Sequence, residues 1–198
     1  MAQSEKQSTK KKIVKTAEQV LWKQGYDGAS LNDVVKTAGL SKGAFFHYYP
    51  NKQSVTLDVI DLYVNEQILV PLEKHLAGAH NVKTGLFAWL EETYGAYSQW
   101  DYKGGCLLGN FALELADKDE VVREHMKQHF LSWENVLTTH LRGVADEGKL
   151  LMEPRQFARL LIAMYEGITM TIKVHKDQNR AGRDFQALAE LIERMIKD

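Results

Sequence analysis

The sequence is poor in the features that mark secreted, disulfide-linked and membrane-spanning proteins. It has 198 residues and one cysteine, Cys106, which excludes an intrachain disulfide and suits a reducing cytoplasm. Its longest apolar run, Leu160 to Tyr165, has six residues, whereas crossing a bilayer takes roughly 18. No hydrophobic segment follows the charged N-terminus, so no secretion signal is visible. We therefore expect a cytoplasmic protein that does not enter the membrane.

Common catalytic motifs are also missing. There is no Gly-x-Ser-x-Gly elbow, Walker loop, dinucleotide glycine motif or His-Glu-x-x-His zinc motif. His125 and His129 have metal-ligand spacing, but no Glu follows His125 and no Glu-x-x-His pair exists for a di-iron bundle. We interpret them as satisfied or solvated histidines and expect no catalytic residue, metal or cofactor. A helical enzyme is the rival hypothesis, and turnover lost on mutation of Cys106 or the histidines would support it.

The charge is distributed unevenly along an otherwise ordinary composition of 44% hydrophobic and 26% charged residues. Up to residue 55 there are nine lysines and four acidic residues, a net charge of +5, so the remainder carries −6 of the total of −1. A basic end on an acidic body is typical of a polyanion binder with a separate regulatory part. Residues 1 to about 8 are polar without an apolar period, and we expect them to be disordered.

Two short helices separated by a tight turn are predicted between residues 30 and 48. Ser30 is suited to cap the first helix, and Gly39 is suited to end it in the left-handed conformation. Ser41 can cap the second helix, 42–48, only two residues later. Helices joined by so short a turn cross steeply, which describes a helix-turn-helix. An amphipathic helix from about residue 13 to Gly25 should pack behind this motif.

The second helix combines a cation, two very small residues and three ring side chains. Small residues let a backbone approach a groove floor, Lys and His can donate to base edges, and Tyr can donate to phosphate. Lys52 lies in the first turn of the next helix, where the dipole disfavours a cation, so it is either a phosphate ligand or a solvated lysine. The candidate DNA-binding residues are Lys10, Ser30, Asn32, Ser41, Lys42, Gly43, Ala44, Phe46, His47, Tyr48 and Lys52.

The segment Gly39-Leu40-Ser41-Lys42-Gly43, followed by Phe45-Phe46-His47-Tyr48-Tyr49-Pro50-Asn51-Lys52, resembles the DNA-binding signature of TetR/AcrR-family transcriptional repressors. The match covers about residues 10–60. It implies a three-helix DNA-binding domain with a basic arm, residues 1–51, and a helical domain for ligand binding and dimerisation, residues 52–198. It further implies a homodimeric repressor that binds a palindromic double-stranded operator and is released by an effector.

The rest of the chain shows helical periods only, so the predicted class is all-α. Pro71 is expected to kink or end the first of these helices. In repressors of this type the last two long helices resemble the halves of a four-helix dimer interface, which would set two recognition helices about 34–36 Å apart. The alternative is that both helices close the core of one chain. The predicted helices are 52–69, 84–100, 106–116, 119–147, 154–176 and 183–197, with loops at 76–83 and 177–182.

The sequence gives less information about an effector site than about DNA binding. Aromatic side chains of the body either line a cavity between helices or form plain core. Cys106 follows two glycines at a predicted helix N-terminus, where the dipole lowers a thiol pKa, and the stretch 104–110 resembles one in electrophile- or oxidant-responsive repressors. An inert buried cysteine is the alternative, and a nonspecific architectural DNA binder without effector is a third hypothesis. The candidate effector-binding residues are Trp89, Trp100, Cys106, Asn110, Phe111, Trp133 and Tyr165.

Overall fold

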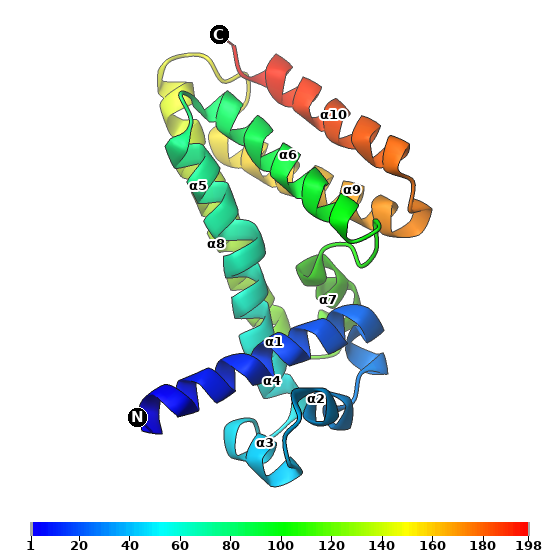
Figure 1. Ribbon diagram of the computed structural model, residues 1–198. Coiled ribbons are helices and arrows are strands. Elements are labelled where there is room, and N and C mark those ends of the chain that lie inside the picture. The colour runs from blue at the N-terminus through cyan, green and yellow to red at the C-terminus, as the bar shows by residue number, and fades with distance from the viewer. Residues whose placement is uncertain (1, 198) are drawn as a thin grey trace.

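The computed structural model describes residues 2–197, with the side chains of residues 2–5 excepted, and within this range it is helical apart from one isolated β-bridge (Figure 1). This confirms the all-α class. In chain order the elements are α1 (Ala2–Gly28), α2 (Leu31–Ala38), α3 (Lys42–Tyr48), α4 (Lys52–Tyr63), the π-helical segment η1 (Val64–Leu69), α5 (Val70–Gly78), α6 (Val82–Gln99), α7 (Leu107–Leu115), α8 (Glu120–Asp146), α9 (Pro154–His175) and α10 (Gln178–Met195).

The predicted helix-turn-helix is present as α2 and α3. The Ser30 hydroxyl accepts from the Asp33 N–H at 3.2 Å, and the Asp33 carboxylate accepts from the Ser30 N–H at 3.0 Å. Gly39 ends α2 with φ 65°, a left-handed conformation that costs glycine nothing. The Ser41 hydroxyl then accepts from the Ala44 N–H at 3.1 Å and starts α3. The caps fix both ends of the turn, as the sequence predicted.

A small core holds α1, α2 and α3 together. Phe45 of α3 is fully buried and belongs to the same apolar cluster as Ile13 of α1 and Val34 of α2. Tyr49, just after α3, is also buried, and its hydroxyl donates to Asp58 of α4 at 2.6 Å. The three helices therefore form one unit, which we call the DNA-binding unit, at the lower end of the molecule in Figure 1.

The first helix is longer than expected. Residues 2–8 were expected to be disordered, but α1 begins at Ala2; Met1 lies outside the described residues. The segment contains good helix formers such as alanine, glutamine, glutamate and lysine. Once the buried part of α1 has nucleated a helix, each further turn requires only propagation, which is inexpensive. Near its other end, Gly25 adopts φ 75° and kinks the helix.

Pro71 does not end the helix that leaves the DNA-binding unit. The chain continues from α4 through η1 into α5, and Pro71 lies in the first turn of α5. The Val70 N–H donates to the Asn65 carbonyl five residues earlier, the wider register of a π turn. Because proline has no N–H to donate, it removes one regular intrahelical bond, and the wider π register lies directly before that position.

Two predicted loops are shorter than expected. α5 reaches Gly78, and Asn81 then caps α6 by accepting from the Thr84 N–H at 2.9 Å. The last helix begins at Gln178 rather than residue 183, since Asp177 accepts from the Arg180 N–H at 3.0 Å. In both places an Asn or Asp interpreted as part of a loop is the cap that starts the helix.

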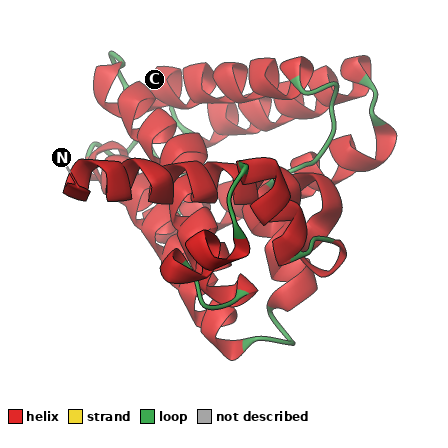
Figure 2. Ribbon diagram, turned by 60° about the horizontal axis from the view of Figure 1, so that its bottom comes forward, coloured by secondary structure: helices red, strands yellow, loops and turns green. Residues whose placement is uncertain are grey.

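The remaining helices, from α4 to α10, form the body of the protein and extend away from the DNA-binding unit. In Figure 1, α5 and α8 rise from α4, and α6, α9 and α10 cover the upper end, with α9 packed against α8 and α10 against α6. Figure 2 shows that short loops join the helices. The β-bridge between Leu150 and Ile196 ties the end of the chain to the α8–α9 connection. Within residues 2–197, no helix combines the length and apolarity that crossing a bilayer demands.

Candidate functional site

The recognition helix α3 presents its polar and ring side chains outward. Lys42, Gly43 and His47 are exposed, while Phe45 and Tyr49 face the core. The space around Gly43 is open, so a surface could approach the backbone there. His47 lies edge-on to the Tyr48 ring at 5.4 Å, which orders the end of this face.

Phe46 is a further outward residue of α3 and the most unusual one. It is 48% exposed although it neighbours the fully buried Phe45. Its ring is therefore available for an apolar contact with a partner that approaches this face of α3. The exposed face of α3 therefore consists of Ser41, Lys42, Gly43, Phe46 and His47, with Ala44 and Tyr48 half-buried at its edge.

The remaining DNA-binding candidates differ in whether their side chains already have a partner within the protein. Asn32 is exposed, whereas the hydroxyls of Ser30 and Ser41 are engaged in caps. Lys10 pairs with Asp58 at 2.7 Å while staying half-exposed. These contacts leave the side chains at the surface but give Ser30, Ser41 and Lys10 a partner within the protein.

Lys52 is partly buried, and its ammonium is engaged with the backbone of the protein itself. Its ammonium donates to the Tyr26 carbonyl and, at 2.6 Å, to the Ala29 carbonyl, and it lies 4.1 Å from the centre of the Tyr26 ring. Burial lowers the pKa of Lys52, with Asp27 and Glu114 opposing that shift. The unfavourable position in the first turn of α4 thus has a structural explanation, because the cation joins α4 to the link between α1 and α2.

The rear of the DNA-binding unit docks on α7 and on the loop before it. Glu114 accepts from the Tyr26 N–H at 2.7 Å and from the Asp27 N–H at 3.3 Å. The Trp22 indole N–H donates to the Gly105 carbonyl at 3.3 Å. A β-carbon on Gly104 would lie 2.1 Å from the Trp22 ring, so only glycine allows this approach. The end of α1 and the loop that carries Cys106 are therefore in direct contact.

The predicted effector residues fall into separate places. Trp89, Trp133 and Tyr165 are buried against one another, with Tyr165 stacked on Trp89 at 5.2 Å and edge-on to Trp133 at 5.1 Å. They form solid core, although Tyr165 also borders a cavity of about 290 Å³. A larger cavity of about 680 Å³ lies between α1 and α7 and is lined by Trp100, Asn110 and Phe111 together with Trp22, Glu114 and Lys173.

Cys106 is buried at the N-cap of α7, next to Glu166 of α9. Burial raises the pKa of the thiol well above its usual value, with the charge of Glu166 acting in the same direction. Of the two alternatives that the sequence left open, this agrees with the inert buried cysteine, because loss of water outweighs the helix dipole here. Burial likewise raises the pKa of Glu166 to about 7. Both residues border a cavity of about 310 Å³, and a β-carbon on Gly109 would lie 2.1 Å from the Glu166 carboxylate.

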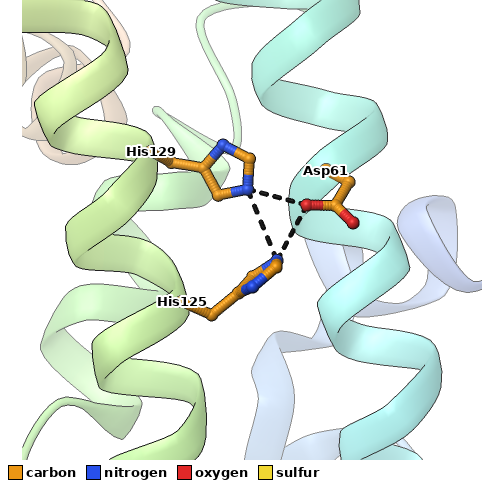
Figure 3. Close-up of side chains that lie close together, drawn as sticks. All are labelled: Asp61, His125 and His129. Atoms are coloured by element: carbon orange, nitrogen blue, oxygen red, sulfur yellow. Dashed lines mark hydrogen bonds and ion pairs between the residues drawn. The ribbon is translucent and has the colours of Figure 1, made fainter.

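The histidine pair contacts a third residue, Asp61, that the sequence did not indicate. His125 and His129 of α8 point toward Asp61 of α4, and each Nε2 lies 2.8 Å from Asp61 Oδ1 (Figure 3). The two Nε2 atoms are 3.4 Å apart. The pair is therefore hydrogen-bonded, in agreement with the sequence interpretation. Asp61 lies 64 residues from His125, so only the packing of α4 on α8 brings them together.

Other residues of interest were missed for different reasons. Trp22 and Glu114 have no motif around them, and their importance depends on the docking of α1 on α7. Glu166 did carry a signal, because it interrupts the wide apolar face of the helix that begins at Pro154. A carboxyl on a buried apolar face must be paired with a partner or hold its proton, because an unpaired buried charge is costly.

A capped helix-turn-helix with an exposed recognition helix, attached to an all-helical body with cavities between helices, defines a DNA-binding regulatory protein. Residues 13–59 match the family described as "Bacterial regulatory proteins, tetR family", and residues 84–188 match "Tetracyclin repressor-like, C-terminal domain". The chain belongs to the TetR family of transcriptional regulators. It is a transcriptional regulator that binds DNA, and the family is not one of enzymes.

Individual relatives extend over nearly the whole chain. An HTH-type transcriptional regulator in the lacX 3' region of Lactococcus lactis is 29% identical over 188 residues, 95% of both chains. The transcriptional repressor NemR of Escherichia coli K12 is 24% identical over 170 residues, 85% of both chains. The reduced form of E. coli NemR has a TM-score of 0.83 over 96% of this chain and 97% of that one. A cysteine mutant of CifR bound to a 26-base-pair operator has a TM-score of 0.79 at 19% identity, over 91% and 94% of the two chains.

Proposed function

We propose that this protein is a homodimeric cytoplasmic repressor that binds a palindromic operator and is released by a small-molecule or electrophile effector. The outward face of α3 carries the proposal, because its exposed lysine, histidine and phenylalanine have no role in the core. We place the domain boundary between residues 51 and 52, where Asn51 caps α4. Residues 1–51 would bind DNA, and residues 52–198 would sense the effector and dimerise.

The proposed contacts divide by chemistry. Lys42 and His47 would donate to base edges in the major groove, where Gly43 and Ala44 allow the backbone close approach, and Phe46 would make an apolar contact with a thymine methyl. Phosphate contacts are assigned to the residues around this face, which are Lys10, Ser30, Asn32, Ser41, Tyr48 and Lys52. Lys52 retains one N–H beyond the two engaged with the backbone.

The dimer proposal is supported by an apolar stripe on α9. Leu160, Met170 and Val174 are exposed there at helical spacing, and Val174 is 72% exposed. Such a stripe in water is costly to solubility and is typical of an interface. We expect α9 and α10 of two chains to pack as four helices, and sedimentation velocity should give twice the chain mass for the wild type. Met170→Glu and Val174→Glu together should give the monomer; an unchanged dimer would reject this surface.

The cavity of about 680 Å³ is the best-supported effector site. It is large enough for a drug-sized molecule and is bounded by the residues that join α1 to α7. An occupant would act on Trp22 and Glu114, and so on α1, whose far side packs against α2. Release would then be a shift between two arrangements of the DNA-binding unit, limited by the preference of the effector for one of them.

An electrophile acting through Cys106 is the second route, and it requires the buried thiol to become accessible. We expect iodoacetamide to modify Cys106 in the native protein at least about tenfold more slowly than in urea at the same pH, because the protonated thiol is unreactive. Fast native alkylation with loss of operator binding would establish the electrophile route instead.

Operator selection from random DNA, followed by footprinting, tests the central proposal. The selected sites should contain an inverted repeat whose halves lie about one DNA turn apart. Binding without sequence preference would contradict it and favour an architectural role. Screening the selected site for release by small molecules separates an effector-controlled repressor from an effector-free one.

A further inference from the structure

Asp61, His125 and His129 form a compact cluster of three side chains from two helices. Each contributes one atom that could ligate a metal, and these atoms lie within 4.8 Å of one another. The histidines are successive on one face of α8, and both point at the same oxygen of Asp61 on α4 (Figure 3). The three side chains thus point toward a common centre, unlike charges that lie in a row along a surface.

The spacing of the cluster fits a first-row transition metal. Metal–nitrogen bonds of about 2.0–2.1 Å at a tetrahedral angle place two imidazole nitrogens about 3.3–3.4 Å apart. The two Nε2 atoms are 3.4 Å apart in this structure. The oxygen–nitrogen distances of 2.8 Å would need to open by about half an ångström, which a rotation of the exposed Asp61 side chain can supply.

The site is also open to an arriving ion. The side chain of Asp61 is 51% exposed, and those of His125 and His129 are 30% and 18% exposed. Asp61 further borders an open cavity of about 840 Å³ between α1 and α4. Two imidazoles and one carboxylate are a borderline donor set, which suits Zn²⁺, Co²⁺ or Ni²⁺ better than Mg²⁺ or Ca²⁺. Water would complete the coordination.

We propose that Asp61, His125 and His129 bind one divalent transition-metal ion of the Zn²⁺ class, which links α4 to α8. α4 begins four residues after the recognition helix ends, and it is already tied to the start of α8 by Gln53, whose amide donates to Asp119 at 2.7 Å. Coordination at Asp61 adds a second, stronger tie two turns further along α4. The ion therefore restrains the helix that carries the DNA-binding unit.

Titration of the metal-free, full-length protein with Zn²⁺ against a chromogenic chelator tests the site. We expect one Zn²⁺ per chain at micromolar or tighter affinity, and at least about tenfold weaker binding in Asp61→Asn, His125→Gln and His129→Gln. His140→Gln is the matched control, because His140 also lies on α8 and contacts one carboxylate, Glu73, at 3.2 Å. It should change the affinity less than twofold.

Co²⁺ as a second probe should give visible absorption bands that Asp61→Asn removes, and Cys106→Ser should leave them unchanged. Zn²⁺ should also raise the melting temperature of the wild type but not of Asp61→Asn, which detects binding even if a variant is less stable. Absence of saturable binding would overturn the proposal. Equal affinity in Asp61→Asn and the wild type, or loss of binding in Cys106→Ser alone, would overturn it as well.

The restraint on α4 has a consequence that rests on the proposed function. Zn²⁺ should change the operator affinity of the wild type by at least about threefold and that of Asp61→Asn not at all. If Zn²⁺ binds at the cluster without changing operator affinity, the restraint is refuted while the metal site stands. If neither the metal-free nor the Zn²⁺-loaded protein selects an operator, the proposed repressor fails and the chelator titration still decides the metal site.

Discussion

Side chains singled out for DNA binding and for effector binding have opposite surroundings. In the DNA-binding unit, Lys42, Phe46 and His47 are exposed on a short helix whose ends are fixed by local caps. In the body, Trp89 and Trp133 are buried in the core, and the others are divided among separate cavities. Local sequence determines where a surface side chain points on a capped helix, whereas the lining of a cavity depends on helices far apart in the chain.

The two regions contact each other at a junction between the end of α1 and α7 with the loop before it. Trp22 and Tyr26 belong to the DNA-binding unit by sequence, yet they bond to Gly105 and Glu114 of the body. Lys52 closes the same junction from α4. The two regions therefore move together or exchange these contacts, and mutations at the junction should affect both.

The largest expected effect separates two adjacent phenylalanines. Phe45→Ala empties a fully buried site and should lower the free energy of unfolding by about 3–5 kcal/mol. Phe46→Ala removes a half-exposed ring and should lower it by less than about 1 kcal/mol while weakening operator binding. Urea unfolding and gel-shift titration measure the two quantities. Equal stability losses would mean that α3 does not present the face described here.

Glu166 gives the next largest effect, and it depends on pH. Burial raises the pKa of this carboxyl from its ordinary value of 4.5 to about 7. Between these values the folded protein holds a proton that the unfolded chain has lost, so stability falls as pH rises from 4.5 through 7. Glu166→Gln removes this loss and should be more stable than the wild type by about 3 kcal/mol at pH 8, with no gain at pH 4.5. Parallel pH profiles of the two proteins would show that the carboxyl is not buried.

A pair of glycine substitutions tests the junction. Gly104→Ala places a methyl group against the Trp22 ring, and it does so at a residue whose φ of 86° disfavours any side chain. This substitution should destabilise the protein by at least about 2 kcal/mol. Gly143→Ala, in an open position inside α8, should stabilise it by about 0.5–1 kcal/mol. Thermal unfolding distinguishes the two. A neutral Gly104→Ala would indicate that the loop and α1 are not in contact in solution.

The smallest effect concerns one charge on α3. Lys42→Ala should weaken operator binding and leave the slope of log binding constant against log salt concentration unchanged, because Lys42 is assigned to a base edge and not to a phosphate. Lys127→Ala on α8, which removes an exposed lysine of the body, should leave both the affinity and the slope unchanged. A slope reduced by about one in Lys42→Ala would show that Lys42 contacts phosphate instead.

The sequence was a good guide where structure is local and a poor one where it is not. Ser30, Gly39 and Ser41 predicted the helix-turn-helix correctly, because a cap acts on the backbone of the next three residues. Asn81 and Asp177 were interpreted as parts of loops although the same rule applies to them. The sequence left Cys106 undecided between a reactive and an inert buried thiol, because the helix dipole is local, while the burial that outweighs it comes from other helices.

By itself the sequence determined the all-α class, the ends of α2 and α3 and the identity of the face that α3 exposes, because caps and periodicity act over a few residues. Tertiary structure alone decided that the Lys52 ammonium bonds to backbone carbonyls near the end of α1, that the predicted effector residues do not share one cavity, and that Asp61 meets His125 and His129. These outcomes depend on how helices pack across dozens of residues. Distance along the chain carries no information about such packing.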